Sequence, residues 1–290
     1  MTRDRSRLSS ILPLAWLTVF FAFPFLLVAK LSMSDVALAI PPYVPQLDWN
    51  RPGDFLRGLD LETYARLASD RLYVDAYLSS LRLAAIGTAI LLAIGYPIAY
   101  GVARCPPGAR LALVMAVMLP FWTSFLIRVY AWIAILKPAG LLNAALGALG
   151  LPPVAILNTE AAVLLGLVYA YLPFMVLPLY AVLSRQDDSL VEAAQDLGAT
   201  PAQAFWRITF PLSLPGAAAG ALLCFIPMAG EFVIPDLLGG SETLMLGRVI
   251  WTEFFANRDW PTASAVALVL LATLLAPILL FERQQAKAPG

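Results

Sequence analysis

The sequence has no histidine, only two cysteines and few charged residues. Without histidine, metal sites and acid–base catalysis that depend on imidazole are excluded. Cys105 and Cys224 are far apart, one at a predicted helix–loop border and one inside a predicted span, so neither a disulfide nor a thiolate metal site is indicated. Charged residues make up 13% of the chain, against about 25% in a soluble domain. The composition therefore indicates a membrane protein, and the zero net charge gives no basic field for nucleic acid.

Long hydrophobic stretches fill the rest of the chain, in which 60% of the residues are hydrophobic. Six of these stretches are long enough to cross ~30 Å of hydrocarbon as helices. The predicted spans are 11–31, 76–103, 111–136, 159–183, 213–235 and 262–281. The predicted fold class is therefore an all-α integral membrane protein with six transmembrane helices, the last five of which form a single transmembrane domain over about 72–281.

The N-terminal segment has the charge pattern of a signal peptide, because Arg3, Arg5 and Arg7 precede the apolar run Ile11–Leu31. This run is about 20 residues long, and no small-x-small cleavage site follows it cleanly. We therefore predict an uncleaved first span.

The distribution of basic residues predicts the orientation. Six spans place both termini on one side, together with loops 104–110 and 184–212. That side, with tails 1–10 and 282–290, holds nine Lys and Arg residues; the longer opposite loops hold seven. The latter loops are 32–75, 137–158 and 236–261. We therefore expect a multi-pass membrane protein with both termini in the cytoplasm.

The cytoplasmic loop 184–212, called the coupling loop below, carries the signals of a helix–turn–helix. Ser189 and Glu192 have the spacing of a capping box that starts a first helix. Gly198 suits a left-handed residue after that helix, and Thr200 can cap a second helix that has Pro201 at its first position. Pro211 and Pro215 are predicted to prevent simple continuation into the next span. Such an element could dock in a groove of a partner protein or lie on the lipid headgroups.

The same residues resemble the EAA motif of ATP-binding-cassette (ABC) importer permeases. That motif reads Glu-Ala-Ala, three residues, Gly, nine residues, Ile-x-Leu-Pro, and here Phe210 replaces the usual Leu. The resemblance implies the type I importer (MetI-like) fold, a place in the bacterial inner membrane, and a coupling helix that seats in an ATPase subunit. The residues expected to carry the coupling are Glu192, Ala193, Ala194, Asp196, Gly198, Phe205, Ile208 and Pro211.

The chain has no ATP-hydrolysing site of its own, because no G-x-x-x-x-G-K-[ST] sequence occurs. We therefore predict that the chain is not an enzyme and binds no cofactor. ATP and Mg²⁺ would be bound by a separate ATPase subunit.

Further segments resemble the polyamine importer permeases, and most closely their putrescine (PotH) type. They are AIPPY (39–43), LYVDAYLSSL (72–81), PFWTSFLIRVYAWIAILK (120–137), VYAYLPFMVLPLY (168–180), GEFVIPDLLGG (230–240), GRVIWTEFF (247–255) and NRDWPTASAVA (257–267). The resemblance implies four kinds of component: this permease, a second homologous permease, two ATPase copies and a periplasmic polyamine-binding protein.

A polyamine path needs carboxylates or aromatic faces. The path candidates are Glu231, Asp236, Trp122, Tyr130, Trp132 and Tyr169. The aromatic residues could instead belong to the interfacial belt, and Glu231 could neutralise Arg128 or Arg82. Candidates for receptor docking are Trp49, Tyr64, Glu242, Glu253 and Arg258.

Other functions remain open at this stage. A permease for spermidine, iron or an opine-type compound would have a similar coupling loop. An ion-coupled secondary transporter would not need that loop. A membrane enzyme would need a convergent catalytic set.

Overall fold

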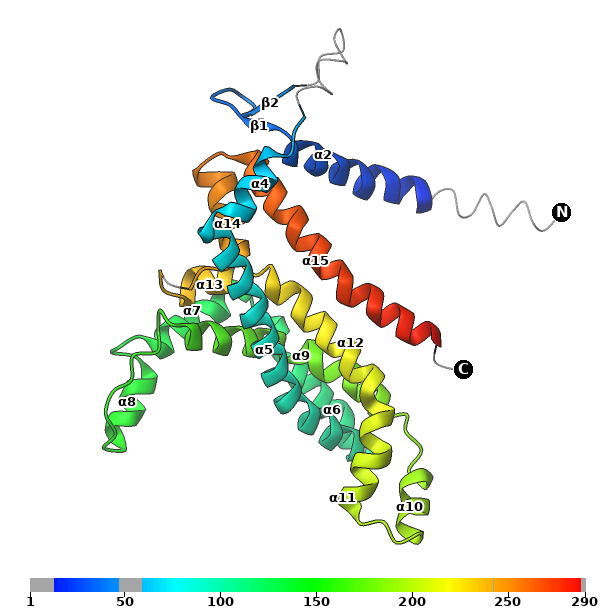
Figure 1. The fold of residues 1–290 in the computed structure, drawn as a ribbon. Helices are drawn as coiled ribbons and strands as arrows, with labels where there is room; N and C mark the ends of the chain where they lie inside the picture. The colour runs from blue at the N-terminus through cyan, green and yellow to red at the C-terminus, as the bar shows by residue number, and fades with distance from the viewer. Residues whose placement is uncertain (1–12, 47–58, 242, 288–290) are drawn as a thin grey trace, which may run out of the picture. The chain divides into compact units, whose positions relative to one another are not determined.

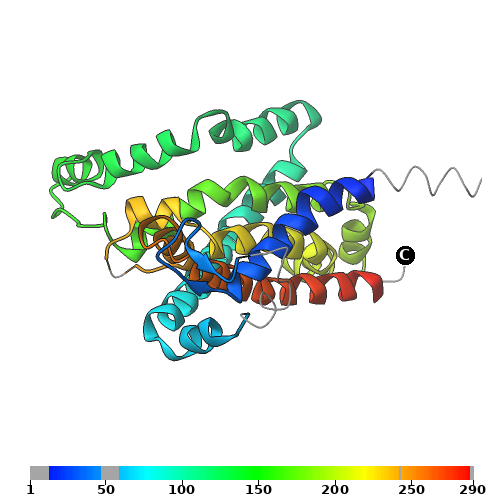
Figure 2. The same cartoon turned by 90° about the horizontal axis from the view of Figure 1, so that it is seen from above.

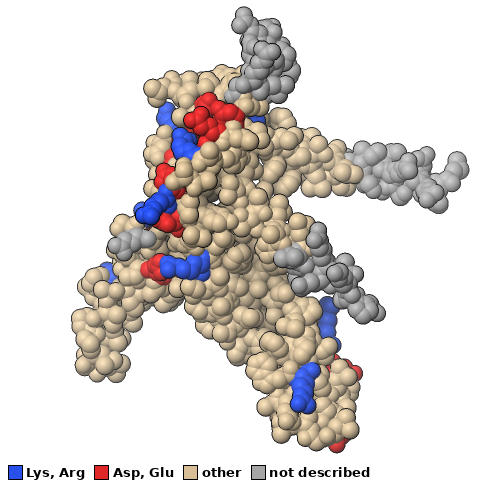
Figure 3. Space-filling model, viewed as in Figure 1, with Lys and Arg blue, Asp and Glu red and all other residues tan. Residues whose placement is uncertain are grey.

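The computed structural model describes residues 13–46, 59–241 and 243–287, with residues 280–287 described by their backbone only. Six helices in these ranges are long and apolar enough to cross a membrane, which confirms the predicted fold class. They are Pro13–Ser32, Arg71–Arg104, Phe125–Ala148, Glu160–Leu183, Pro201–Ala229 and Trp260–Leu279. Most of the face in Figure 3 lacks charged side chains, as expected for surfaces covered by lipid or protein.

The chain divides into two compact units, whereas a single domain over 72–281 was predicted. Unit 1 comprises Met1–Tyr77 and Leu246–Leu275, and unit 2 comprises Leu78–Met245 and Ala276–Gly290. The elements in chain order are η1 (Thr18–Ala22), α2 (Phe23–Ser32), β1 (Asp35–Val36), β2 (Tyr43–Val44), α4 (Glu62–Ser69), α5 (Arg71–Arg104), α6 (Pro107–Met118), η2 (Leu119–Trp122), α7 (Phe125–Leu136), α8 (Leu141–Ala148), α9 (Glu160–Leu183), α10 (Ser189–Asp196), α11 (Pro201–Ala204), η3 (Phe205–Thr209), α12 (Phe210–Ala229), α13 (Val233–Leu238), α14 (Leu246–Trp251), η4 (Thr252–Ala256) and α15 (Trp260–Lys287) (Figure 1).

Hydrogen bonds between distant segments stabilise unit 1. Arg66 on α4 donates to the hydroxyl of Thr262 on α15 at 2.6 Å. The hydroxyl of Tyr73 donates to Glu253 at 3.0 Å, and that of Tyr64 donates to Ser32 at 2.7 Å. Tyr64 and Glu253, expected to dock a receptor, therefore have partners within their own unit.

The other receptor-docking candidates are only partly described. Arg258 adopts a positive φ of 55° in the turn before α15 and is exposed. Trp49, Glu242 and the predicted tail 1–10 lie outside the described residues.

Helices α9 and α12 form the closely packed centre of unit 2, side by side in Figure 2. Small residues at two turns of α12 allow this approach. A Cβ atom on Gly216 would lie 3.0 Å from the Pro178 carbonyl oxygen, and one on Gly220 would lie 3.1 Å from the Met175 carbonyl oxygen. This small-xxx-small spacing is typical of membrane helices in direct backbone contact.

The predicted third span, 111–136, is not one helix. Helix α6 ends at Met118, a 3₁₀ turn covers Leu119–Trp122, and α7 begins at Phe125. Pro120 has no N–H for the helical ladder, and Thr123 is extended with its hydroxyl bonded to the Pro120 carbonyl at 2.9 Å. The apolar run continues across the break, so hydropathy alone could not locate it.

The predicted fifth span, 213–235, also differs at both ends. A continuous helix runs from Pro201 to Ala229, so Pro211 and Pro215 do not interrupt it as predicted. The π-helical turn η3 directly precedes Pro211 and accommodates the missing N–H. The helix ends at Ala229 rather than 235, because the chain turns at Gly230 and begins α13.

Candidate functional site

The coupling loop begins at two aspartates that follow α9. The Ser189 amide donates to the Asp187 carboxylate at 3.0 Å, and this bond lowers the pKa of Asp187 below its ordinary value. Asp188 forms an ion pair with Arg104 at the end of α5. Asp188 is already helical, and α10 has no side-chain cap at this position. The predicted Ser189–Glu192 capping box is therefore wrong, since the chain enters the helix before Ser189.

A tight turn closes α10. Gly198 has φ = +87°, its amide donates to the Gln195 carbonyl at 2.8 Å, and the Ala199 amide donates to the Ala194 carbonyl at 3.0 Å. These two bonds define a Schellman motif, in which a left-handed residue reverses the chain. The predicted role of Gly198 in the turn is confirmed.

The second helix starts with a complete capping box. The Thr200 hydroxyl accepts the Gln203 amide at 3.3 Å, and the Gln203 side chain accepts the Thr200 amide at 3.0 Å. Pro201 follows at the first helical position, as predicted. The side chain of Gln186 also donates to the Thr209 carbonyl at 3.1 Å, which ties the two arms of the loop together.

Phe205 anchors the coupling loop to its own unit. Its ring makes edge contacts with Tyr96 and Tyr100 of α5, with centroids 5.8 Å and 5.5 Å away. The hydroxyl of Tyr96 is hydrogen-bonded to that of Ser213 on α12 at 2.8 Å. Phe205, expected to touch a partner, is half-buried and holds the loop against α5.

The exposed surface of the coupling loop includes two large apolar side chains among polar ones. Leu197 is 89% exposed beside the Gly198 turn, and Trp206 is 62% exposed. The sequence placed both on the apolar faces of the two predicted helices, but they were not among the residues expected to carry the coupling. Of the expected coupling residues, those that are exposed are Glu192, Ala193, Asp196, Gly198 and Pro211, while Ala194 and Ile208 are half-buried. Figure 1 shows α10 and α11 at one end of α12.

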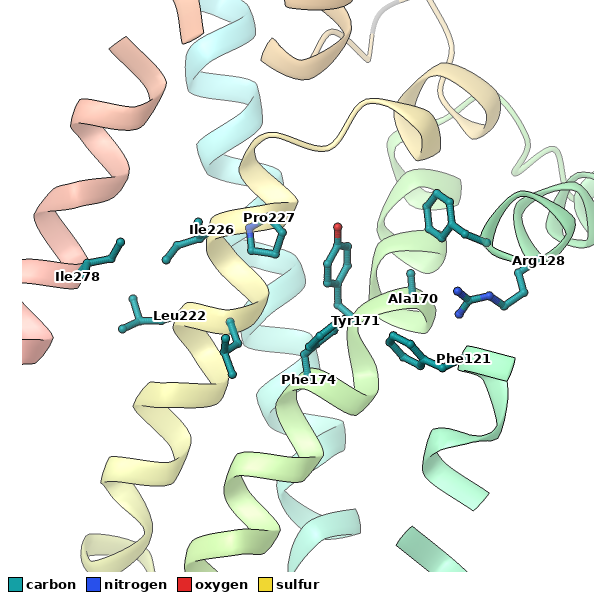
Figure 4. A pocket seen from close by; sticks show the side chains of 11 residues that line it. Phe121, Arg128, Ala170, Tyr171, Phe174, Leu222, Ile226, Pro227 and Ile278 are labelled. Carbon is teal, nitrogen blue, oxygen red and sulfur yellow. The ribbon is translucent and has the colours of Figure 1, made fainter. Parts of the chain in front are cut away.

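A second candidate site is a cavity of about 550 Å³ between α7, α9 and α12. We call it the Arg128 pocket after its one charged lining residue. Its walls are formed mainly by Phe121, Phe125, Tyr171, Phe174, Leu222 and Ile226. The Arg128 guanidinium lies 5.3 Å from the Phe121 ring centroid and points toward Ala170 in Figure 4.

Two nitrogen atoms of Arg128, Nε and Nη1, are buried without a hydrogen-bond partner among the described residues. Contacts with the faces of Phe121 and Phe125 compensate part of this cost. An unpaired buried charge is nevertheless costly, so an ionisable residue within a span is a functional candidate. Sequence analysis noted Arg128 only as a possible partner of Glu231.

The carboxylate of Glu231 does not pair with Arg128 but has other partners. Its carboxylate accepts the Tyr171 hydroxyl at 2.6 Å and the amides of Phe232 and Val233 at 3.2 and 3.1 Å. It therefore joins α9 to the start of α13. Arg82 forms an ion pair with Glu160 instead, and within the described residues Glu231 forms no ion pair with Arg128 or Arg82.

The other path candidates are dispersed. Trp132 and Tyr169 pack edge to face with centroids 5.5 Å apart. Trp122 and Tyr130 are 71% and 57% exposed, and Asp236 is also exposed. Among the described residues that line the Arg128 pocket, none of the six candidates occurs. Within the described ranges, no three Cys, Asp or Glu side chains are grouped as metal ligands.

Comparison with known proteins places this architecture in a family. Residues 108–281 match the family model described as "Binding-protein-dependent transport system inner membrane component". The spermidine/putrescine transport system permease protein PotB of Haemophilus influenzae is 40% identical over 94% of this chain and 90% of its own length. The Escherichia coli protein of the same name is 42% identical over 77% of this chain and 82% of its own length.

A solved structure has the same fold. A chain from a bacterial ABC transporter involved in the import of the acidic polysaccharide alginate aligns with a TM-score of 0.76. The alignment covers 100% of this chain and 98% of that chain at 18% identity. From the family match and the relatives together, this chain belongs to the binding-protein-dependent transport system inner membrane components, the permease subunits of ABC importers.

Proposed function

We propose that this chain is the permease subunit of an ABC importer that moves a polyamine from the periplasm to the cytoplasm. The observation that carries the proposal is the coupling loop, where the Schellman turn at Gly198 and the Thr200 cap hold exposed apolar side chains outward. A rigid, short helix of this kind suits a groove on a partner. Its partner is an ATPase that supplies the energy for transport. This sequence has no phosphate-binding loop and so cannot hydrolyse ATP itself.

The proposed orientation follows from the same partner. An ATPase that uses cytoplasmic ATP must meet the coupling loop in the cytoplasm. An even number of spans then places both termini there as well, in agreement with the excess of Lys and Arg on that side.

The proposed assembly contains a second homologous permease, two ATPase copies and a periplasmic binding protein. The family description supports the binding protein, since it names binding-protein-dependent transport. The apolar surfaces of the spans support lipid and a second permease as neighbours, because at most 50% of any span window is buried within this chain.

Putrescine is the proposed substrate, and spermidine is the alternative. The names of the relatives include both polyamines. Polyamines are cations, so the proposed path follows the carboxylates Glu231 and Asp236 and the aromatic pair Trp132 and Tyr169. The Arg128 pocket is not part of this path, because its one charged lining residue has the same sign as the substrate.

The test is uptake by the complete importer, with its ATPase, second permease and binding protein, in sealed vesicles. We expect ATP-dependent accumulation of labelled putrescine that vanadate stops and a protonophore does not. If unlabelled spermidine competes more strongly than unlabelled putrescine, the substrate is spermidine instead. Uptake that stops only with the protonophore would contradict the proposal.

Glu231 is tested in the same assay. We expect Glu231→Gln to lower uptake more than it lowers assembly of the complex. If uptake per assembled complex is unchanged, this carboxylate does not lie on the path.

A further inference from the structure

The Arg128 pocket combines an apolar wall with an incompletely paired cation. Among its lining residues Arg128 alone is charged, and its Nε and Nη1 atoms are buried without partners in the described part of the chain. The remaining wall is hydrocarbon apart from the hydroxyl of Tyr171, which donates to Glu231 (Figure 4). A ligand that fits must present one anionic group surrounded by apolar surface.

Three carboxylates of unit 2, those of Glu231, Glu160 and Asp188, already have other partners. Glu231 accepts three hydrogen bonds from Tyr171 and two backbone amides. Glu160 pairs with Arg82, and Asp188 pairs with Arg104. None of these three can neutralise Arg128 without leaving its present partner.

The depth of the pocket argues against a lipid headgroup. Helix α9 has 24 residues, and Ala170 and Phe174 lie near its middle. At about 1.5 Å per residue, the pocket is roughly 15 Å from either end of that helix. Phosphate groups of lipids lie at the ends of a span, whereas a protein side chain can present a charge at this depth.

We propose that a carboxylate of the second permease subunit enters the Arg128 pocket and pairs with Arg128. The partner residue is an Asp or Glu on a membrane helix, flanked by apolar side chains that cover Phe174, Leu222 and Ile226. This inference rests on the proposed two-permease importer. It assigns Arg128 to subunit assembly and excludes it from polyamine binding.

Arg128→Met gives opposite results for the two possible states of the arginine. If a partner carboxylate pairs with Arg128, methionine leaves that carboxylate buried and unpaired, and assembly is weakened. If Arg128 has no anionic partner, methionine removes a costly charge, and assembly is unchanged or stronger. We expect at least a fivefold loss of the second permease that co-purifies with this chain, normalised to the amount of this chain in the membrane.

Arg82→Met is the matched control, because it breaks an ion pair within this chain whose side chains are 55% and 45% exposed. We expect less than a twofold change. Arg128→Lys keeps the charge and should retain more of the second permease than Arg128→Met, which separates loss of charge from a folding defect. Unchanged or increased co-purification in Arg128→Met would overturn the proposal.

A genetic test identifies the partner. Arg128→Glu should abolish co-purification, and second-site changes of Asp or Glu to Lys in the second permease should restore it. Restoring changes found only in this chain would overturn the proposal. So would native mass spectrometry that finds phosphatidylglycerol bound to the wild-type complex and lost from Arg128→Met.

The assembly readout needs neither ATP nor substrate. A complex that assembles through Arg128 but does not transport polyamine would contradict the proposed function alone. A transporting complex that is insensitive to Arg128→Met would contradict this inference alone.

Discussion

The coupling loop and the Arg128 pocket belong to the same unit but are held in shape by different forces. Backbone hydrogen bonds within a few residues fix the loop, through the Gly198 turn and the Thr200 cap. Packing among three separate helices fixes the pocket, whose charged group keeps two nitrogen atoms without partners in the described chain. The hydrogen bonds that shape the loop thus come from its own residues. The charged group of the pocket gains partners for these two atoms only when another group enters the pocket.

This difference predicts two kinds of failure. Changes in the loop should alter how ATP hydrolysis is linked to uptake, with little effect on the stability of the permease. Changes around the pocket should alter stability or assembly first. The predictions below test this distinction, starting with the largest expected effect.

Gly198→Val should reduce ATP-driven uptake by about tenfold or more. A β-branched residue at φ = +87° costs on the order of 1–2 kcal/mol, and about 1.4 kcal/mol corresponds to a tenfold change in population. The measurement is vanadate-sensitive uptake per assembled complex in vesicles.

Gly150→Val is the control, because Gly150 also has a positive φ (72°) and open space around its Cα but lies after α8. We expect the backbone strain in Gly150→Val to be similar to that in Gly198→Val, but uptake per assembled complex to be retained. Equal loss in both variants would mean that strain in general, and not the coupling turn, limits transport.

Glu231→Gln should destabilise the assembled complex by about 1 kcal/mol, because the amide replaces a charged acceptor of the Tyr171 hydroxyl and two backbone amides. Thermal unfolding of the purified complex measures the change. Asp236→Asn, at an exposed carboxylate on the following helix α13, should change it less. A larger shift for Asp236→Asn would reverse the roles of the two carboxylates.

Thr200→Ala should weaken the second helix of the coupling loop by about 0.5–1 kcal/mol through loss of its capping box. We expect faster amide exchange over α11 while the unfolding temperature of the complex is nearly unchanged. Ser184→Ala, which removes a 3.4 Å hydrogen bond at the end of α9, should leave this exchange unaffected. A clear drop in unfolding temperature for Thr200→Ala would contradict the separation of the two regions.

Asp187 should make the start of α10 weakly dependent on pH. The Ser189 amide keeps the pKa of Asp187 below its ordinary value of 3.8, so the carboxylate contributes stability above that value. This contribution is lost as the pH falls through the lowered pKa. The protection of the Ser189 amide, the intrinsic exchange rate divided by the observed rate at the same pH, should therefore fall in acid, and Asp187→Asn should remove the dependence. Identical acid profiles in both proteins would contradict the assignment.

The coupling loop could be predicted in part because its determinants are local. Gly198, Thr200 and Pro201 act through their own backbone geometry, and all three were placed correctly. The Ser189–Glu192 box failed because the preceding Asp187 competes for the same amide. Pro211 does not interrupt the helix as predicted, because the π-helical turn that ends at Thr209 accommodates its missing N–H.

The Arg128 pocket could not be predicted, because its walls come from segments far apart in sequence. Arg128, Tyr171 and Leu222 meet only through the packing of α7, α9 and α12. Hydropathy predicted the number of spans, but it missed the break in the third span and both ends of the fifth, and it does not report which face of a span meets which neighbour. The break before α7, the helix that carries Arg128, lies inside an uninterrupted apolar run.

The continuous helix from Pro201 to Ala229 has a mechanical consequence. It begins at the turn of the coupling loop, and its last two turns supply Leu222 and Ile226 to the Arg128 pocket. Between them, Gly216 and Gly220 press directly on the backbone of α9. The coupling loop and part of the pocket wall are therefore two ends of one helix, which is held against α9 between them. Their separation along the chain is bridged by a single backbone hydrogen-bond ladder and not by a series of side-chain contacts.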